Sequence, residues 1–227
     1  MLIVSVDTSG RKGSIALCRG DEDSFDVLQL ISLEGGTYSA QLLPRIAEAL
    51  QQQGFNKAEV DGFVVVSGPG SFTGLRVGLS TVKGLCEVLG KPLATVSMLE
   101  VLVLKHGREY ENVSAVLDAG RGEIYVGEYK VATSHATLVR EYIAKLDEFV
   151  AQQRVGGNDL LTVDVNVAKA LRDTNSRVAL VVPVDAGEIG RIGMRKLLSG
   201  ETADPATVDV NYIRRSDAEI FSTPQKT

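Results

Sequence analysis

The feature that most constrains the fold is an order of short strands and helices that occurs twice along the chain. In each half, alternating apolar residues predict three consecutive strands, followed by helices that alternate with single strands. Each half also opens with a strand that ends in an aspartate and a glycine turn: Asp7 in residues 4–10 (VSVDTSG) and Asp118 in residues 115–120 (AVLDAG). Such mixed sheets need helices to cover them, so the sequence predicts an α/β protein with two similar lobes of βββαβα type.

The periodicity also predicts where each element lies. In the first half we expect strands at residues 2–6, 14–18, 25–33, 62–67 and 93–96, and helices at 39–53, 72–89 and 98–106. In the second half we expect strands at 113–118, 123–129, 138–143, 160–163 and 178–182, and helices at 145–152, 166–174 and 186–198. We therefore place the N-terminal lobe at 1–106 and the C-terminal lobe at 107–205, with 206–219 returning near the first lobe and 220–227 as a flexible tail.

Two lobes placed face to face leave a cleft between the ends of their first strands, where we expect Asp7 and Asp118 to meet. Asp7, Thr8 and Ser9 would place a carboxylate near Mg²⁺ and a turn of donors near a phosphate. The simpler alternative is that these residues only shape a β-turn. The duplicated plan resembles the actin, heat-shock chaperone and sugar-kinase superfamily, with its ribonuclease H-like lobes, in which two hairpin turns hold nucleotide phosphates. That resemblance makes weak binding of ATP or ADP with Mg²⁺ a hypothesis, although no cofactor is required.

The segment 68–78 reads GPGSFTGLRVG and joins a predicted strand to a predicted helix. A helix N-terminus after a glycine turn offers free N–H groups to an anion. The glycines do not have the spacing of a P-loop or of a dinucleotide-binding turn, because Thr73 stands where both motifs require glycine. We therefore interpret the segment as a sharp exit from the strand with Ser71 as the N-cap of the helix, and keep a phosphate site as the minority alternative.

The helix at 72–89 is apolar over roughly 200° of its circumference, about twice the width that a helix needs to cover one core. A helix enclosed by its own fold is one explanation, and a helix shared with a partner is the other. We favour the second, with Val77, Leu85 and Val88 on the protein's own core. The predicted partner interface then consists of Phe72, Leu75, Arg76, Leu79, Val82, Lys83 and Cys86.

Composition excludes several classes of function. A formal net charge of −5 argues against a protein that binds nucleic acid alone, because phosphate contacts need a basic surface. No apolar run approaches the ~20 residues of a membrane span, and we expect a cytoplasmic protein with Cys18 and Cys86 as reduced core thiols. The two histidines, His106 and His135, lack the spacing of paired metal ligands, so we expect no bound zinc.

Four segments together resemble the TsaB (YeaZ) family, bacterial glycoprotease-like proteins that act in threonylcarbamoyladenosine synthesis on tRNA. They lie at residues 7–9, 68–78, 118–129 and 212–219, and they read DTS, GPGSFTGLRVG, DAGRGEIYVGEY and YIRRSDAE. The resemblance is strong over residues 1–130, weaker over 131–205, and returns at 206–219. It implies the same two-lobed fold, and it implies that the helix at 72–89 carries dimer contacts.

The resemblance also implies a role. It points to a non-catalytic subunit that dimerises with the catalytic paralogue TsaD, is joined by the ATPase TsaE, and meets tRNA through the complex. A homodimer of the isolated chain is the alternative assembly, and the sequence does not decide between the two. TsaD holds its metal with two helical histidines, whereas residues 37–44 of this chain contain none, and Tyr38 stands where the family often has histidine. The absence of histidine from residues 37–44 argues against a metallopeptidase function. The alternative is a small nucleotide-dependent kinase or ATPase that uses the cleft of Asp7 and Asp118.

Overall fold

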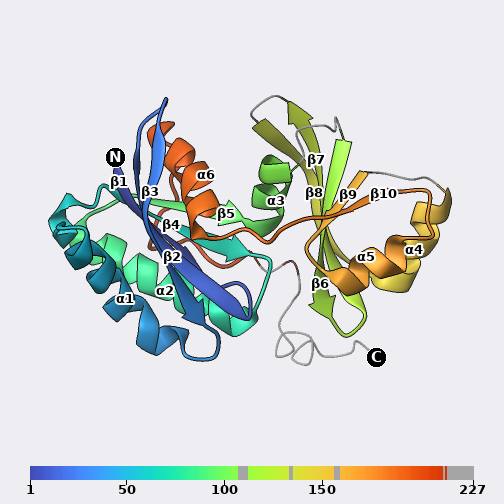
Figure 1. The fold of residues 1–227 in the computed structure, drawn as a ribbon, viewed down its shortest axis with the longest axis horizontal. Helices are drawn as coiled ribbons and strands as arrows, with labels where there is room; N and C mark the ends of the chain where they lie inside the picture. The colour runs from blue at the N-terminus through green and yellow to red at the C-terminus, as the bar shows by residue number, and fades with distance from the viewer. Residues whose placement is uncertain (107–111, 133–134, 156–158, 212, 214–227) are drawn as a thin grey trace, which may run out of the picture.

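The computed structural model describes residues 1–106, 112–132, 135–155, 159–211 and 213, and it shows two lobes that each contain a five-stranded sheet (Figure 1). The first sheet has the order β3-β2-β1-β4-β5 and the second has the equivalent order β8-β7-β6-β9-β10. The first consists of β1 (Leu2–Asp7), β2 (Lys12–Gly20), β3 (Phe25–Glu34), β4 (Gly62–Gly68) and β5 (Leu93–Ser97). The second consists of β6 (Asn112–Gly120), β7 (Glu123–Ala132), β8 (His135–Lys145), β9 (Asp159–Thr162) and β10 (Arg177–Leu180). The predicted duplicated α/β fold is therefore confirmed.

Strand direction follows the same rule in both lobes. β1 pairs antiparallel with β2 and parallel with β4, and β6 pairs antiparallel with β7 and parallel with β9. The central strand β1 is buried along its whole length, and β4 is buried at all but one residue. Continuous apolar runs suit such strands because both of their faces are covered. The carboxyl ends of β1 and β6 consequently carry Asp7 and Asp118 out of the two sheets at equivalent places.

Helices cover the sheets. They are α1 (Tyr38–Gln52), α2 (Phe72–Leu89), α3 (Met98–His106), α4 (Leu146–Val155), α5 (Val165–Leu171) and α6 (Ala186–Leu198), with a short 3₁₀ turn at Lys57–Glu59. The first sheet has α1 and α2 side by side on one face and α6 on the other (Figure 1). Among the helices in the described parts of the chain, none has both the length and the apolar character needed to cross a bilayer.

Two helices cross between the lobes. α3 follows the first sheet in sequence, but its Leu99 and Leu102 belong to the core of the second lobe. α6 follows the second sheet, but its Ile189 and Met194 belong to the core of the first lobe, where the helix packs on β1 and β2. The predicted division at 106/107 follows the order of the chain, whereas α6 packs on the sheet of the other half and α3 contributes to both cores, with Met98 and Val101 in the core of the first lobe.

Charged pairs join the two crossed helices. Glu100 of α3 and Lys196 of α6 lie 2.9 Å apart, and the side chains are both only 18% exposed. Lys105, also on α3, forms a second ion pair with Glu188 on α6. Partly buried pairs are screened less by salt than exposed ones. The crossing is thus fixed by charge as well as by apolar contact.

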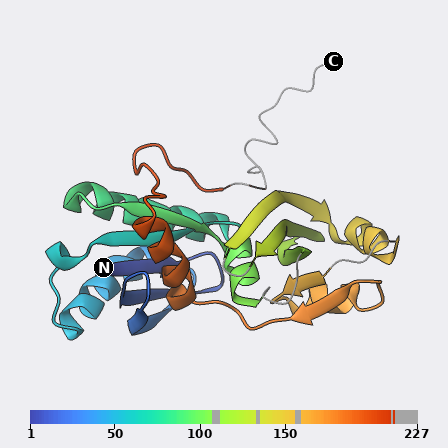
Figure 2. The same cartoon turned by 90° about the horizontal axis from the view of Figure 1, so that it is seen from above.

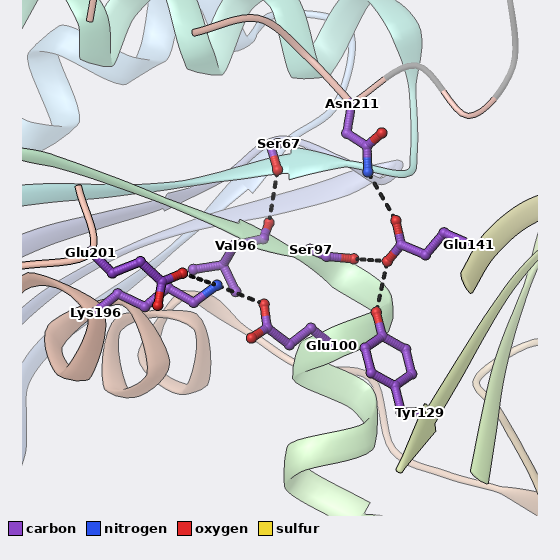
Figure 3. A network of polar contacts seen from close by, with 9 residues as sticks. All are labelled: Ser67, Val96, Ser97, Glu100, Tyr129, Glu141, Lys196, Glu201 and Asn211. Carbon is purple, nitrogen blue, oxygen red and sulfur yellow. Dashed lines mark hydrogen bonds and ion pairs between the residues drawn. The ribbon is translucent and has the colours of Figure 1, made fainter. Parts of the chain in front are cut away.

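A polar network around Glu141 joins the lobes a second time (Figure 3). The carboxylate of Glu141, on β8, accepts hydrogen bonds from Ser97 at the end of β5, from Tyr129 on β7 and from Asn211. Asn211 lies in the segment after α6, which runs back over the first lobe toward the junction (Figure 2). The backbone N–H of Asn211 also donates to the carbonyl of Ser67. Burial and the neighbouring Glu141 raise the pKa of Tyr129, so its hydroxyl stays a donor to that carboxylate.

Candidate functional site

The turn between β1 and β2 holds the first aspartate. One oxygen of Asp7, Oδ1, accepts hydrogen bonds from the backbone N–H of Ser9 at 2.8 Å and from the Ser9 hydroxyl at 2.7 Å. The residue is only 5% exposed. Burial raises the pKa of the Asp7 carboxyl, and the nearby Asp185 raises it further, while the two hydrogen bonds from Ser9 lower it. Asp7 is therefore held in one orientation at a place that disfavours its charge.

The same turn packs tightly on the start of α2. The Thr8 hydroxyl donates to the carbonyl of Gly74 at 2.7 Å, and the backbone N–H of Ser71 donates to the carbonyl of Ser9 at 2.6 Å. A Cβ atom on Gly74 would overlap the Thr8 carbonyl oxygen. The glycine-rich segment thus allows contact between two parts of the chain rather than contact with a phosphate.

Two donors at the N-terminus of α2 are already bonded within the chain. Ser71 is the N-cap, as predicted: its hydroxyl accepts the Gly74 N–H at 3.3 Å. The Ser71 N–H is already bonded to Ser9. Because these donors are among those that an anion would need, the geometry favours the packing interpretation of residues 68–78.

The turn between β6 and β7 holds the second aspartate and is more open. Asp118 Oδ1 accepts the Gly120 N–H at 2.8 Å, and the Asp118 backbone N–H donates to Asp164 Oδ2 at 2.7 Å. Gly120, Arg121 and Gly122 all have positive φ angles, of 74°, 58° and 77°. Asp164 was not among the residues predicted from sequence. It follows the carboxyl end of β9, as Asp7 and Asp118 lie at the carboxyl ends of β1 and β6, and that shared position would have identified it.

Both turns line one cleft between the lobes. Its wider part has a volume of about 840 Å³, and a deeper pocket of about 230 Å³ adjoins it. Asp7 and Asp118 both line the deeper pocket, together with Asp164. Ser9 lines both parts, whereas Thr8 is directed to α2 and lines neither. The structure therefore brings three of the four predicted cleft residues together and adds a third carboxylate.

Other reactive groups lie away from this cleft. Burial raises the pKa of Cys18 and of Cys86 to about 12, so both thiols stay protonated in the core, as predicted. His106, at the end of α3, has Nε2 3.2 Å from the Val182 carbonyl oxygen. Within the described residues, no three His, Cys, Asp or Glu side chains form a group that could hold a metal ion.

Tyr38 occupies the position where the sequence departs from a common histidine. The tyrosine is buried at the start of α1 and its hydroxyl donates to the Gly10 carbonyl at 2.9 Å. Its ring lies against Gly13, where a Cβ atom would be 2.9 Å from a ring carbon. Tyr38 therefore fixes the tip of the first hairpin beside the wider part of the cleft, which it also lines.

The predicted partner interface on α2 is largely wrong. Leu75, Leu79, Val82 and Cys86 are at most 3% exposed and belong to the core of the first lobe. Lys83 donates to the Val208 carbonyl of the segment after α6. Phe72 and Arg76 remain at the surface, with the guanidinium 3.9 Å from the ring centre. The apolar seam faces the sheet because α2 and α1 together cover that face.

A different surface of these helices is exposed. We define the outer helix face as the exposed residues of α1 and α2 that point away from the first sheet. Val88, expected in the core, is 82% exposed on it, and Leu43 is 53% exposed. Its members are Ser39, Ala40, Leu43, Pro44, Arg45, Ala47, Gln51 and Gln52 of α1, and Phe72, Thr73, Arg76, Ser80, Gly84, Glu87 and Val88 of α2.

Comparisons with known proteins agree with this fold. The family model described as TsaD, tRNA N6-adenosine threonylcarbamoyltransferase, matches residues 35–184. The Bacillus subtilis tRNA threonylcarbamoyladenosine biosynthesis protein TsaB is 34% identical over 131 residues, which are 57% of this chain and 56% of that protein. The Escherichia coli protein of the same name is 29% identical over 134 residues, 57% of this chain and 55% of that protein. The matches thus span about half the length of these relatives.

A solved structure extends the similarity over nearly the whole chain. The crystal structure of a Pseudomonas aeruginosa protein with similarity to the peptidase YeaZ has a TM-score of 0.75 at 22% identity. The superposition covers 94% of this chain and 99% of that one. At this identity the similarity shows that the two chains share the two-lobed fold.

Proposed function

Because the chain belongs to the TsaB (YeaZ) family, whose shared domain the TsaD model describes, we propose that it acts in threonylcarbamoyladenosine synthesis on tRNA. Relatives in Bacillus subtilis, Haemophilus influenzae and Escherichia coli are all named as biosynthesis proteins for this modification. The net charge of −5 suits a protein that meets tRNA through a complex rather than alone.

In this proposal the chain is a non-catalytic subunit that binds the catalytic paralogue TsaD, with the ATPase TsaE joining the pair. The observation that carries it is the outer helix face, where α1 and α2 lie side by side and expose apolar and small residues. A paralogue with the same domain has an equivalent pair of helices. Two such pairs can pack about a pseudo-twofold axis, in the way that identical surfaces meet in a symmetric dimer. The same face would support a homodimer in the absence of the paralogue.

The experiment is to charge the outer helix face without touching the core. The double variant Leu43→Glu/Val88→Glu replaces two exposed apolar side chains, so its melting temperature should match the wild type. Its affinity for the paralogue should fall more than roughly tenfold, since losing one central contact commonly costs ~2 kcal/mol. Light scattering of the mixed proteins measures this. The matched control is Val155→Glu, which changes a valine that is 90% exposed on the second lobe and should leave assembly intact.

Unchanged assembly in the double variant would refute the proposed interface. The second candidate, a small nucleotide-dependent kinase or ATPase, is favoured by the shared position of Asp7 and Asp118 in one cleft. ATP hydrolysis by the pure chain that is lost in Asp118→Asn would favour that candidate over the scaffold.

A further inference from the structure

The deeper pocket of the cleft combines apolar walls with a strongly acidic lining. Its walls come from both lobes and from the segment after β10, and they comprise Pro69, Met98, Leu102, Leu117, Val163, Pro183 and Val184. Among the described residues that line it, the charged groups are Asp7, Asp118 and Asp164 and one cation, Lys12, which is exposed. A concave apolar site with a few convergent polar groups is the usual form of a small-molecule site.

Each of the three carboxylates is fixed through one oxygen. Asp7 uses Oδ1 toward Ser9, Asp118 uses Oδ1 toward the Gly120 N–H, and Asp164 uses Oδ2 toward the Asp118 N–H. Across the described residues, the second oxygen of each accepts no hydrogen bond. Asp7, which is 95% buried, thus presents an unpartnered oxygen to the pocket that it lines. The side chains are oriented in advance for a donor that the described residues do not supply.

The electrostatics of the pocket indicate the charge of that donor. Within the described part of the chain, none of the three carboxylates forms an ion pair, and burial together with Asp185 raises the pKa of Asp7. A buried carboxylate without a partner opposes folding, and a cation bound beside it offsets that cost. A nucleotide phosphate would instead bring negative charge to negative charge, at a place where donors of the α2 N-terminus are already used.

A single metal ion does not match this arrangement either, since the described residues contain no group of three carboxylate, histidine or cysteine side chains able to hold one. A molecule larger than one ion can span carboxylates that are further apart. We propose that the deeper pocket binds a small organic cation, an amine or amidine with an apolar body. The ammonium or amidinium group donates to the free oxygens of Asp118 and Asp164, which the hydrogen bond from the Asp118 N–H already joins, while Asp7 adds negative charge to the same pocket. The apolar body packs on Met98, Leu102 and Val184.

The test compares probes of matched shape on the full chain. Phenethylamine is the cation, phenylpropionate the anion and phenylpropanol the neutral molecule, each titrated by calorimetry and by NMR. Phenethylamine should bind, and phenylpropionate should not bind measurably. Asp164→Asn keeps the size of the side chain and an acceptor for the Asp118 N–H, but it should weaken phenethylamine binding by about tenfold (~1.4 kcal/mol). Asp173→Asn, an exposed aspartate outside the pocket, is the control and should bind as the wild type does.

If Asp164→Asn has a lowered melting temperature, Asp118→Asn serves as a second variant in which the affinity for phenethylamine should fall. Equal affinity of phenethylamine for Asp164→Asn and Asp173→Asn would overturn the proposal. So would stronger binding of phenylpropionate, or the displacement of phenethylamine by ATP with Mg²⁺, which would make this a nucleotide pocket. Assembly with the paralogue uses another surface, so the failure of one proposal leaves the other standing.

Discussion

The first turns of the two lobes begin alike and end in different environments. Asp7 ends β1, and Asp118 lies two residues before the end of β6, the central strand of a sheet with the same strand order. In the first lobe the turn is buried beneath the start of α2, and Thr8 and Ser9 bond to that helix. In the second lobe the turn is open, and its backbone is held by the side chain of Asp164 instead.

The difference shows that topology places the aspartates while the following helix decides how accessible their turns are. Gly70, Gly74 and Gly78 let α2 approach the first turn, because a Cβ atom on any of them would clash with Thr8 or Ser9. α5, the equivalent helix of the second lobe, has no glycine and is only seven residues long. A closed first turn and an open second turn leave an asymmetric cleft between similar lobes.

The largest expected effect comes from lifting α2 off the first sheet. Leu79→Lys puts an ammonium at a site that is 3% exposed in the core of the first lobe. Removing a buried leucine side chain alone costs about 2–5 kcal/mol, and an unpaired buried charge adds to that. The cooperative thermal transition should be lost or shifted far down. The control is Val88→Lys, on the same helix and 82% exposed, which should have the melting temperature of the wild type. A wild-type melting temperature for Leu79→Lys would show that Leu79 is not part of the core.

The next test compares the two turns directly. Gly74→Ala places a Cβ against the Thr8 carbonyl, a backbone atom that cannot move aside, and should destabilise by more than ~2 kcal/mol. Gly120→Ala, in the open turn, meets no atom and should cost only about 1 kcal/mol for its positive φ. Urea denaturation measures both. Similar losses in the two variants would mean that the first turn is not closed as described.

A control for helix propensity lies on the same helix. Gly84 is exposed, and a Cβ atom there meets nothing within 4 Å. Gly84→Ala should therefore stabilise α2 by about 0.5–1 kcal/mol. This outcome would show that a loss in Gly74→Ala arises from the contact with Thr8 and not from alanine in the helix.

A smaller effect is expected at the tip of the first hairpin. Tyr38→Phe keeps the ring against Gly13 and removes only the hydrogen bond to the Gly10 carbonyl. Such a bond contributes about 1 kcal/mol, so the free energy of unfolding should fall by roughly that amount. Hydrogen exchange should increase at residues of this hairpin and not at those of the second lobe, and faster exchange in both lobes would contradict the local role of Tyr38.

The smallest effect concerns the charge of Asp7. Its folded-state pKa lies above the ordinary value of 3.8, chiefly because of burial. The folded state therefore holds its proton more tightly than the unfolded state, and this contribution to stability falls as pH rises from about 3.8 through the folded pKa. Asp7→Asn lacks this loss, so its melting temperature at pH 7 should equal or exceed that of the wild type.

The difference in melting temperature between Asp7→Asn and the wild type should vanish as the pH is lowered below 3.8, where both side chains are neutral. Melts recorded between pH 3 and pH 7 test this sign. A variant that is less stable than the wild type only at neutral pH would show that the carboxylate charge stabilises the fold. Assembly of Asp7→Asn with the paralogue should be unchanged.

Much of the fold followed from local pattern. The predicted limits of α2, α3 and α6 coincide with those in the structure, and the strands differ by a few residues. The spacing of apolar residues predicts these elements because each helix or strand buries one face, and the residues of that face recur with the period of the element. The aspartates at the ends of β1 and β6 were likewise visible, since they stand beside glycine turns at equivalent points of a repeat.

The spacing of apolar residues does not predict which other element covers a buried face. Leu75 and Leu79 have the pattern of a partner interface and of a core alike, and only the packing of α1, α2 and the first sheet assigns them to the core. The spacing likewise does not predict that α3 and α6 each pack on the sheet of the other half, because these contacts join residues far apart in the chain.

By itself, then, the sequence determined the order of the elements, the doubled plan and the place of Asp7 and Asp118 at the strand ends. The tertiary structure alone decided that α3 and α6 cross between the lobes, that Asp164 joins the cleft and that Val88 rather than Leu79 faces solvent. The physical reason is that local spacing reflects the free energy of burying one face, whereas the partner of that face is chosen by the summed packing of the whole chain.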